Sequence, residues 1–286
     1  MTPTTTLDDK LAELERLLAE LDSVLVAFSG GVDSALLLAV ASRVLGDRCT
    51  ALTALSETLP DREWEDARAL GEHLGVRHVT VRSNELEIEG YRTNPKDRCY
   101  HCKTELYSLC RQRADELGIA TIVDGCNLDD LGDYRPGRLA AAEKGVRSPL
   151  IEARLTKADV RELSRRLGLP TWTKAAFACL GSRFPYGTEI TAERLAQVDR
   201  CEQALRALGF PQMRARWHDT VVRIEVPPDD LPRLVSPEIR DALVAACKAA
   251  GFLYVAVDLQ GYRMGSLNEA LPSASPVVPL SRLGAR

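Results

Sequence analysis

The chain has 286 residues, with 41 acidic and 37 basic side chains, so its formal net charge is -4 at pH 7 with histidine neutral. This length suits one large domain or two smaller ones and excludes a minimal scaffold stapled by disulfides. Hydrophobic residues make up 45% and charged residues 27%, which excludes a fibrous or disordered chain. The acidic balance gives nucleic acid no long-range attraction, although it is compatible with a local basic patch.

The first residues lack the basic segment and the unbroken apolar core of a signal peptide, and no apolar run reaches the ~18 residues that span a membrane. We therefore expect a cytoplasmic protein without a membrane partner. In that reducing compartment the eight cysteines are expected to be thiols, so their grouping carries more information than their even number.

The first half of the chain alternates between helical and strand-like segments. An amphipathic helix covers the leucines between Leu7 and Leu21, and a short apolar strand over 24–28 follows it. The later segments are a helix over 35–45, a strand over 49–55, a helix over 60–74, a strand over 77–81, a helix over 103–117, a strand over 120–125 and a helix over 156–167. This alternation predicts an α/β fold in which helices cover both faces of a parallel sheet.

The second half has a different pattern and predicts a smaller α+β domain. Its segments are a helix over 191–208, a strand hairpin over 213–226, a helix over 236–250 and a strand over 252–259. The expected organisation is a first domain over 1–170, an irregular loop over 171–190, a second domain over 191–270 and, because Pro and Ser are frequent there, a disordered tail over 271–286.

A Ser-Gly-Gly-Val-Asp-Ser segment lies between the first strand and the next helix. Its two glycines allow successive backbone N–H groups to surround phosphate oxygens at a helix N-terminus, and its serines add hydroxyl donors. The aspartate of this segment would repel the phosphates unless it binds a Mg²⁺ ion that bridges them, so we expect it to bind Mg²⁺. The Walker A and dinucleotide patterns are both absent, and the alternative is a polar turn whose glycines serve geometry alone. The candidate residues are Ser29, Gly30, Gly31, Asp33 and Ser34.

The cysteines fall into two groups. Cys99 and Cys102 form a C-x-x-C motif just before a predicted helix, which fits a redox dithiol, half of a zinc site, half of an iron–sulfur site or plain packing. Cys179 lies in the irregular loop, with Arg183 nearby in sequence. The remaining ones are expected to be buried core residues: Cys49, Cys110, Cys126, Cys201 and Cys247.

Polar residues gather where predicted strands end, which is the usual ligand edge of a parallel sheet. Ser56 follows the second strand and is a candidate nucleotide contact. The fourth strand is followed by Asp124, Asn127, Asp129, Asp130 and Asp133. For Asp129 and Asp130 a helix-capping role is favoured over ligand binding.

The strand over 213–218 places Arg214, Arg216 and His218 on one face. On pattern alone this face is predicted to be solvated.

Together, the Ser29–Ser34 segment, the C-x-x-C motif, the Asp124–Asp130 segment and the Cys179–Gly187 segment resemble the LarE family of ATP-dependent sulfur transferases, a branch of the PP-loop ATP pyrophosphatases. The resemblance extends over about residues 5–270. It implies that ATP adenylates a carboxylate of a pyridinium-3,5-dicarboxylate mononucleotide, and that sulfur then displaces AMP to give a thiocarboxylate for the nickel-pincer cofactor of lactate racemase. It also implies ATP and Mg²⁺ as cofactors and a homo-oligomer.

The resemblance carries roles over to individual residues. Cys179 falls at the position of the sulfur-donating cysteine. Ser56 and Asn127, which follow predicted strands, are the candidate ATP contacts outside the Ser29–Ser34 segment. The substrate phosphate would be bound by Ser182, Arg183, Arg214 and Arg216, and further acidic positions that could bind metal are Glu202 and Glu225.

Two sulfur sources remain open. Family members that have only the equivalent of Cys179 give up the sulfur of that cysteine. Members with three cysteines are thought to hold a [4Fe-4S] cluster, for which the ligands in this chain would be Cys99, Cys102 and Cys179. His101 keeps zinc as an alternative.

Three other functions compete with this hypothesis. A tRNA thiolase also combines a PP-loop with cysteines, but it needs a positive surface that the net charge does not promise. An ammonia-using synthetase has no need for the three cysteines. A regulatory module would bind ATP without turning it over.

Overall fold

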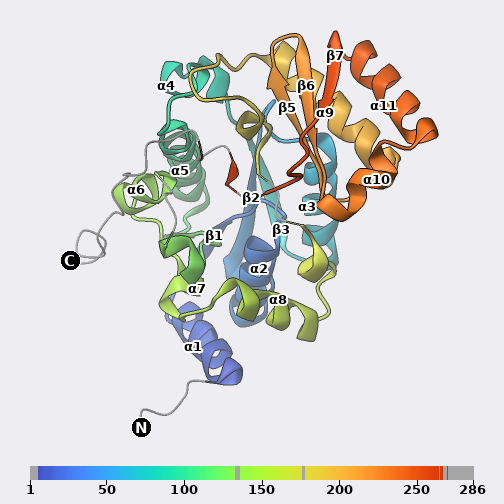
Figure 1. Ribbon diagram of the computed structural model, residues 1–286. Coiled ribbons are helices and arrows are strands. Elements are labelled where there is room, and N and C mark those ends of the chain that lie inside the picture. Colours follow the sequence, from blue (N-terminus) through green and yellow to red (C-terminus); the bar gives the residue numbers. More distant parts are fainter. Residues whose placement is uncertain (1–5, 133–135, 176–177, 264, 267–268, 270–286) are drawn as a thin grey trace.

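The computed structural model describes residues 6–132, 136–175, 178–263, 265, 266 and 269 (Figure 1). Asp133 and the tail predicted for 271–286 lie outside the described residues. The first sheet contains β1 (Val24–Ala27), β2 (Cys49–Leu55), β3 (Arg77–Arg82) and β4 (Thr121–Val123). All its pairings are parallel and the strand order is β3-β2-β1-β4, which confirms the predicted parallel sheet.

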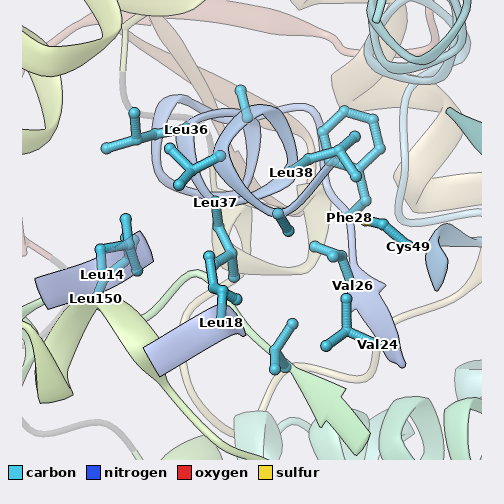
Figure 2. Close-up of a cluster of buried hydrophobic side chains, with 14 of the residues drawn as sticks. Leu14, Leu18, Val24, Val26, Phe28, Leu36, Leu37, Leu38, Cys49 and Leu150 are labelled. Atoms are coloured by element: carbon cyan, nitrogen blue, oxygen red, sulfur yellow. The ribbon is translucent and has the colours of Figure 1, made fainter. Parts of the chain in front are cut away.

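Helices cover both faces of this sheet, as the sequence predicts. Alternate side chains of β1 point to opposite faces, so Val24 and Val26 enter one core and Leu25 enters the other. The first core packs against α1 (Leu7–Ala19), α2 (Val32–Leu45), α3 (Asp61–His73), α7 (Pro149–Glu152) and α8 (Lys157–Arg166). Figure 2 shows the part of this core where α1, β1 and α2 meet. The second packs against α5 (Arg98–Leu117) and α6 (Gly137–Glu143). The central strand β1 is therefore apolar on both faces, whereas the edge strand β3 carries Arg77, His78 and Arg82 and is partly exposed.

The second unit is built on a three-stranded sheet. Its strands β5 (Arg214–His218) and β6 (Val221–Glu225) form the expected antiparallel hairpin, and β7 (Tyr254–Val257) pairs parallel to β6 at the sheet edge. Its helices are α9 (Ala192–Ala207), α10 (Leu231–Leu234) and α11 (Pro237–Ala249). Figure 1 shows this unit, coloured orange to red, at one end of the parallel sheet.

The two units are joined through a shared core. Tyr91, on the short helix α4 (Glu89–Arg92), is buried in the hydrophobic cluster of the second unit, together with Leu180 and Phe184 of the 171–190 loop. That loop contains two 3-10 turns, Pro170–Thr173 and Leu180–Arg183. The later part of the loop, with Leu180, Phe184 and Ile190, therefore packs in the second core, whereas the turn Pro170–Thr173 packs against α8 and α2.

One helix begins earlier than its sequence pattern indicates. Helix α5 starts at Arg98, five residues before the predicted start at Lys103, so Cys99 and Cys102 lie in its first turns and not ahead of it. None of the described helices is long and apolar enough to span a membrane.

Candidate active site

The Ser29–Ser34 segment leads from β1 into α2 with an open helix N-terminus; because α2 begins at Val32, three residues before its predicted start, Asp33 and Ser34 lie in its first turn. Gly30 has a φ of +71°, and a Cβ there would lie 2.9 Å from the Ala67 side chain on α3, so the loop requires glycine at this position. The hydroxyls of Ser29 and Ser34 are 3.1 Å apart. Gly31 caps α2 without any side-chain hydrogen bond to the first turn. The backbone N–H groups of that turn are thus oriented for an anion, as the phosphate-loop interpretation requires.

The end of β4 packs directly on this loop. The strand order reverses between β1 and β4, and ligands of open α/β sheets bind at such a point. A Cβ on Gly125 would lie 2.8 Å from the backbone N of Ser34, so the two segments are in close contact. Asn127 Nδ2 donates to Asp33 Oδ1 over 3.0 Å. Two residues that the sequence assigned separately to the nucleotide therefore touch each other.

Asp33 has a second partner that no sequence motif indicates. Lys157, the first residue of α8, donates from Nζ to Asp33 Oδ2. Its backbone N is held by Asp129 Oδ2 at 2.8 Å. The only sequence signal for this lysine was its place at the start of a predicted helix.

The other acidic residues after β4 have structural roles. Asp130 completes a capping box with Asn127, so the predicted capping role of Asp129 and Asp130 is confirmed. Asp124 is buried and accepts hydrogen bonds from Tyr107 Oη at 2.8 Å and from Ser148 Oγ at 2.7 Å.

The loop that carries Cys179 reaches the carboxyl end of β2. The backbone N of Leu180 donates to the Thr58 carbonyl over 3.1 Å, and the Thr58 hydroxyl lies 2.9 Å from the Ser56 hydroxyl. Arg98 donates to the carbonyl of Gly181 over 2.6 Å. The cysteine loop is therefore fixed both to the predicted nucleotide edge and to the first turn of α5.

The sulfur atoms of this region differ in their surroundings. Cys99 is exposed, whereas Cys102 and Cys179 are half-buried. Burial raises the pKa of the Cys102 thiol, and the charges of Glu85 and Cys179 raise it further. The Cys102 thiol donates to Glu85 Oε1 over 3.5 Å. Cys102 and Cys179 are therefore electrostatic neighbours, and Glu85 is a buried acid that the sequence pattern did not indicate.

The described residues contain no group of three or more His, Cys, Asp or Glu arranged to hold a single metal ion.

Cys49, Cys110, Cys201 and Cys247 are buried, as expected, but the prediction for Cys126 was wrong. Cys126 is half-buried at the end of β4, and its thiol donates to Asp124 Oδ2 over 3.3 Å. The reason is its position after the last β4 residue, where the chain leaves the sheet. It therefore lies beside the candidate site and not in a core.

Lys103 lies between these groups. Its side chain passes the face of Tyr107, with Nζ 5.7 Å from the ring centroid. Burial lowers the pKa of Lys103, but the negative charges of Cys102, Cys126 and Asp124 outweigh burial, so the net pKa is raised. Lys103 is thus a cation next to both the C-x-x-C motif and the turn after β4.

The two arginines of β5 are buried, so the prediction of a solvated β5 face was wrong for two of its three residues. Arg214 is 7% and Arg216 5% exposed, while His218 is exposed as predicted. Arg216 donates to the Ser182 carbonyl and to Glu225 Oε2, both at 2.8 Å. The turn around Ser182 lies over this part of β5 and keeps solvent from it.

Arg183 is fully buried and connects the cysteine loop to α9. It forms two bonds to the Glu202 carboxylate, at 2.7 and 2.8 Å, and donates to the carbonyls of Ala178 and Cys179 at 2.8 and 3.2 Å. Burial acts to raise the pKa of Glu202, but Arg183 outweighs it and the pKa is lowered. The backbone on either side of Cys179 is therefore held by a buried ion pair.

Comparison with known proteins places this geometry in a family. Residues 12–104 match the family model described as asparagine synthase. An uncharacterized protein of Synechocystis sp. is 47% identical over 265 residues, which are 93% of this chain and 99% of that protein. The pyridinium-3,5-bisthiocarboxylic acid mononucleotide synthase of Lactiplantibacillus plantarum is 41% identical over 270 residues, covering 94% of this chain and 97% of the relative.

The chain belongs to the LarE family. It is an ATP-dependent sulfurtransferase with a PP-loop, which confirms the resemblance drawn from its motifs. A glutamine-hydrolyzing GMP synthase component from Methanothermobacter thermautotrophicus is 29% identical over 157 residues, which are 52% of this LarE chain and 51% of that protein. That more distant similarity covers only part of the chain.

Proposed function

We propose that this LarE protein adenylates a carboxylate of pyridinium-3,5-biscarboxylic acid mononucleotide and converts it to a thiocarboxylate for the nickel-pincer cofactor of lactate racemase. The name of the L. plantarum relative supports this substrate class. The observation that carries the proposal is the contact between the Cys179 loop and the nucleotide edge, through the 3.1 Å bond from Leu180 N to the Thr58 carbonyl. Sulfur delivery and carboxylate activation would then occur in one place.

In the first step a substrate carboxylate oxygen attacks the α-phosphorus of ATP, and pyrophosphate leaves. The N-terminus of α2 and the hydroxyls of Ser29 and Ser34 would bind the departing phosphates. Asp33 has the hard oxygen donors that Mg²⁺ prefers, and Mg²⁺ bound there would neutralise phosphate charge. Lys157 pairs with Asp33 in the structure and would be available to the phosphates as a second cation. Ser56 and Asn127 would complete the nucleotide contacts.

In the second step sulfur attacks the acyl carbon, and the bond to AMP breaks. We assign delivery to Cys179, because its loop touches the edge where the acyl adenylate would form. None of Cys99, Cys102 and Cys179 is in a disulfide, and thiolates of this kind would suit a [4Fe-4S] cluster, which would supply an extra sulfide at an iron without a protein ligand. The competing proposal is that Cys179 gives up its own sulfur.

The substrate phosphate is assigned to the arginine-rich turn and strand, because guanidinium groups bind phosphate in a fixed bidentate geometry. These residues are Ser182, Arg183, Arg214 and Arg216. Glu202 pairs with Arg183 and Glu225 pairs with Arg216 in the structure. A metal-binding role for these two carboxylates stays a prediction. A homo-oligomer likewise stays a prediction.

The experiment compares wild type with Cys179→Ala, and with Cys110→Ala as a matched change of a buried cysteine. Substrate-dependent pyrophosphate release and thiocarboxylate are measured in parallel. We expect Cys179→Ala to keep pyrophosphate release within about twofold and to lose thiocarboxylate, because only the second step needs the sulfur. Full thiocarboxylate formation by Cys179→Ala would refute the assignment. Pyrophosphate release that requires tRNA, or an amide product with ammonia, would indicate the competing enzymes.

The two sulfur sources are separated by anaerobic purification, with iron and sulfide counts and mass spectrometry of the protein after turnover. A Cys179 lighter by one H₂S means sacrifice. An intact Cys179 with bound iron and sulfide means catalysis.

A further inference from the structure

Lys103 is a cation without a polar partner in the described part of the chain. No hydrogen bond or ion pair engages its ammonium there: Nζ lies 5.7 Å from the centroid of the Tyr107 ring, and the charges of Cys102, Cys126 and Asp124 act on it without a direct bond. A Cβ on Gly137, the first residue of α6, would lie 2.7 Å from Lys103 Cγ. The glycine thus leaves the space through which the lysine stem passes.

Lys103 lies between the cysteines proposed for sulfur delivery and the turn that packs on the phosphate loop. On one side is Cys102, its neighbour in α5, whose thiol faces Glu85 and which interacts electrostatically with Cys179. On the other side is the Tyr107 ring, whose hydroxyl donates to Asp124 over 2.8 Å at the start of the turn that packs through Gly125 on the phosphate loop. A positive charge at this junction lies between the sulfur donor and the nucleotide edge.

The anions expected at this junction come from the substrate. Resting on the proposed function, we infer that Lys103 binds the reacting carboxylate of the substrate and then the oxyanion that forms when sulfur attacks it. In that attack the sulfur–carbon bond forms and the carbonyl π pair moves to oxygen. The oxyanion then collapses and expels AMP. A fixed cation at the site of the developing charge stabilises such a state.

Lys103 is thereby distinguished from the other cations of the site. Lys157 contacts Asp33 of the phosphate loop, and Arg216 contacts Ser182 and Glu225 in the second unit. On the proposed function these two cations would meet the phosphates of ATP and of the substrate. Lys103 is left to recognise a carboxylate.

The test uses the full chain, purified anaerobically, with Lys103→Gln and Lys103→Arg. Lys144→Gln is the matched control, because Lys144 is exposed at the end of α6. Calorimetric titration gives the Kd of the dicarboxylate mononucleotide, of its phosphate-free nucleoside and of ATP. Thermal unfolding verifies that each variant is folded.

We expect Lys103→Gln to weaken binding of both the mononucleotide and the nucleoside about tenfold or more, because a charge-assisted hydrogen bond is lost. ATP binding should stay within about twofold, and Lys103→Arg should recover most of the affinity because it keeps the charge. Lys144→Gln should bind like wild type.

Three results would overturn the inference. The first is unchanged substrate affinity in a folded Lys103→Gln. The second is a loss of affinity for ATP alone. The third is a loss of affinity for the mononucleotide but not for the nucleoside. Either of these two results would mean that Lys103 binds a phosphate. If wild type binds no dicarboxylate and forms no thiocarboxylate, the proposed function itself fails, so the two failures are distinguishable.

Discussion

At the scale of single residues, Arg183 shows how one buried charge shapes a reactive loop. Two of its nitrogens bind Glu202, and a third holds the carbonyls beside Cys179. With 0% and 2% exposed side chains, neither ion is left in contact with solvent. The cost of removing both charges from water offsets much of the attraction between them, so the pair adds little net stability. Each charge nevertheless compensates the burial of the other.

We predict that Glu202→Met and Arg183→Met each lower the free energy of unfolding by about 3–5 kcal/mol, because each leaves an uncompensated buried charge. The double variant should lose much less than the sum of the two. Urea unfolding of the four proteins at pH 7 measures the cycle. Additive losses would contradict the buried pair.

The stabilisation that the Arg183–Glu202 pair provides should be lost at acidic pH. Since the pKa of Glu202 is lowered from its ordinary value of 4.5 in the fold, the contribution of the pair is complete above pH 4.5. It is lost as the pH falls below 4.5 and through the lowered pKa. The difference between wild type and Glu202→Met should therefore shrink in that acidic range.

At the scale of elements, the site depends on close contact between the turn after β4 and the start of α2. Gly125 makes that contact, with its missing Cβ 2.8 Å from Ser34 N and 3.0 Å from Ser34 Cα. Both are backbone atoms, which cannot rotate away. Any side chain at 125 must therefore displace either the phosphate loop or the turn that carries Asn127.

We predict that Gly125→Ala destabilises the fold by about 1–3 kcal/mol through overpacking and weakens ATP binding. Gly132→Ala is the matched control, because a Cβ there would meet only the Asp129 carbonyl, at 3.8 Å. Calorimetric titration with ATP and urea unfolding measure the two effects. Equal behaviour of the two variants would mean that the contact does not position the loop.

At the scale of the whole molecule, the sequence predicts the parallel sheet well because strands β1 and β4 are short and largely apolar and the strands alternate with helices. The phosphate loop and Cys179 were found because each has a distinctive local pattern. Lys103, Lys157 and Glu85 were missed because their contacts with the candidate site depend on strand order and helix packing, which no local pattern shows.

Errors in predicting burial have a similar cause. A period of two separates the faces of β5, but it does not indicate whether another layer covers the polar face. The turn at Ser182 does so for Arg216. The burial of Cys126 was overestimated, because β4 ends at Val123 and Cys126 lies beyond the part of the sheet that the helices cover.

The proposed reaction requires that ATP cleavage and sulfur transfer to a carboxylate both occur on this chain. Mass spectrometry of the small-molecule products tests this requirement, with purified protein, ATP and the dicarboxylate mononucleotide. We predict a product in which one oxygen is replaced by sulfur, with one AMP and one pyrophosphate formed for each thiocarboxylate. AMP formation without sulfur in the product would contradict the proposed reaction.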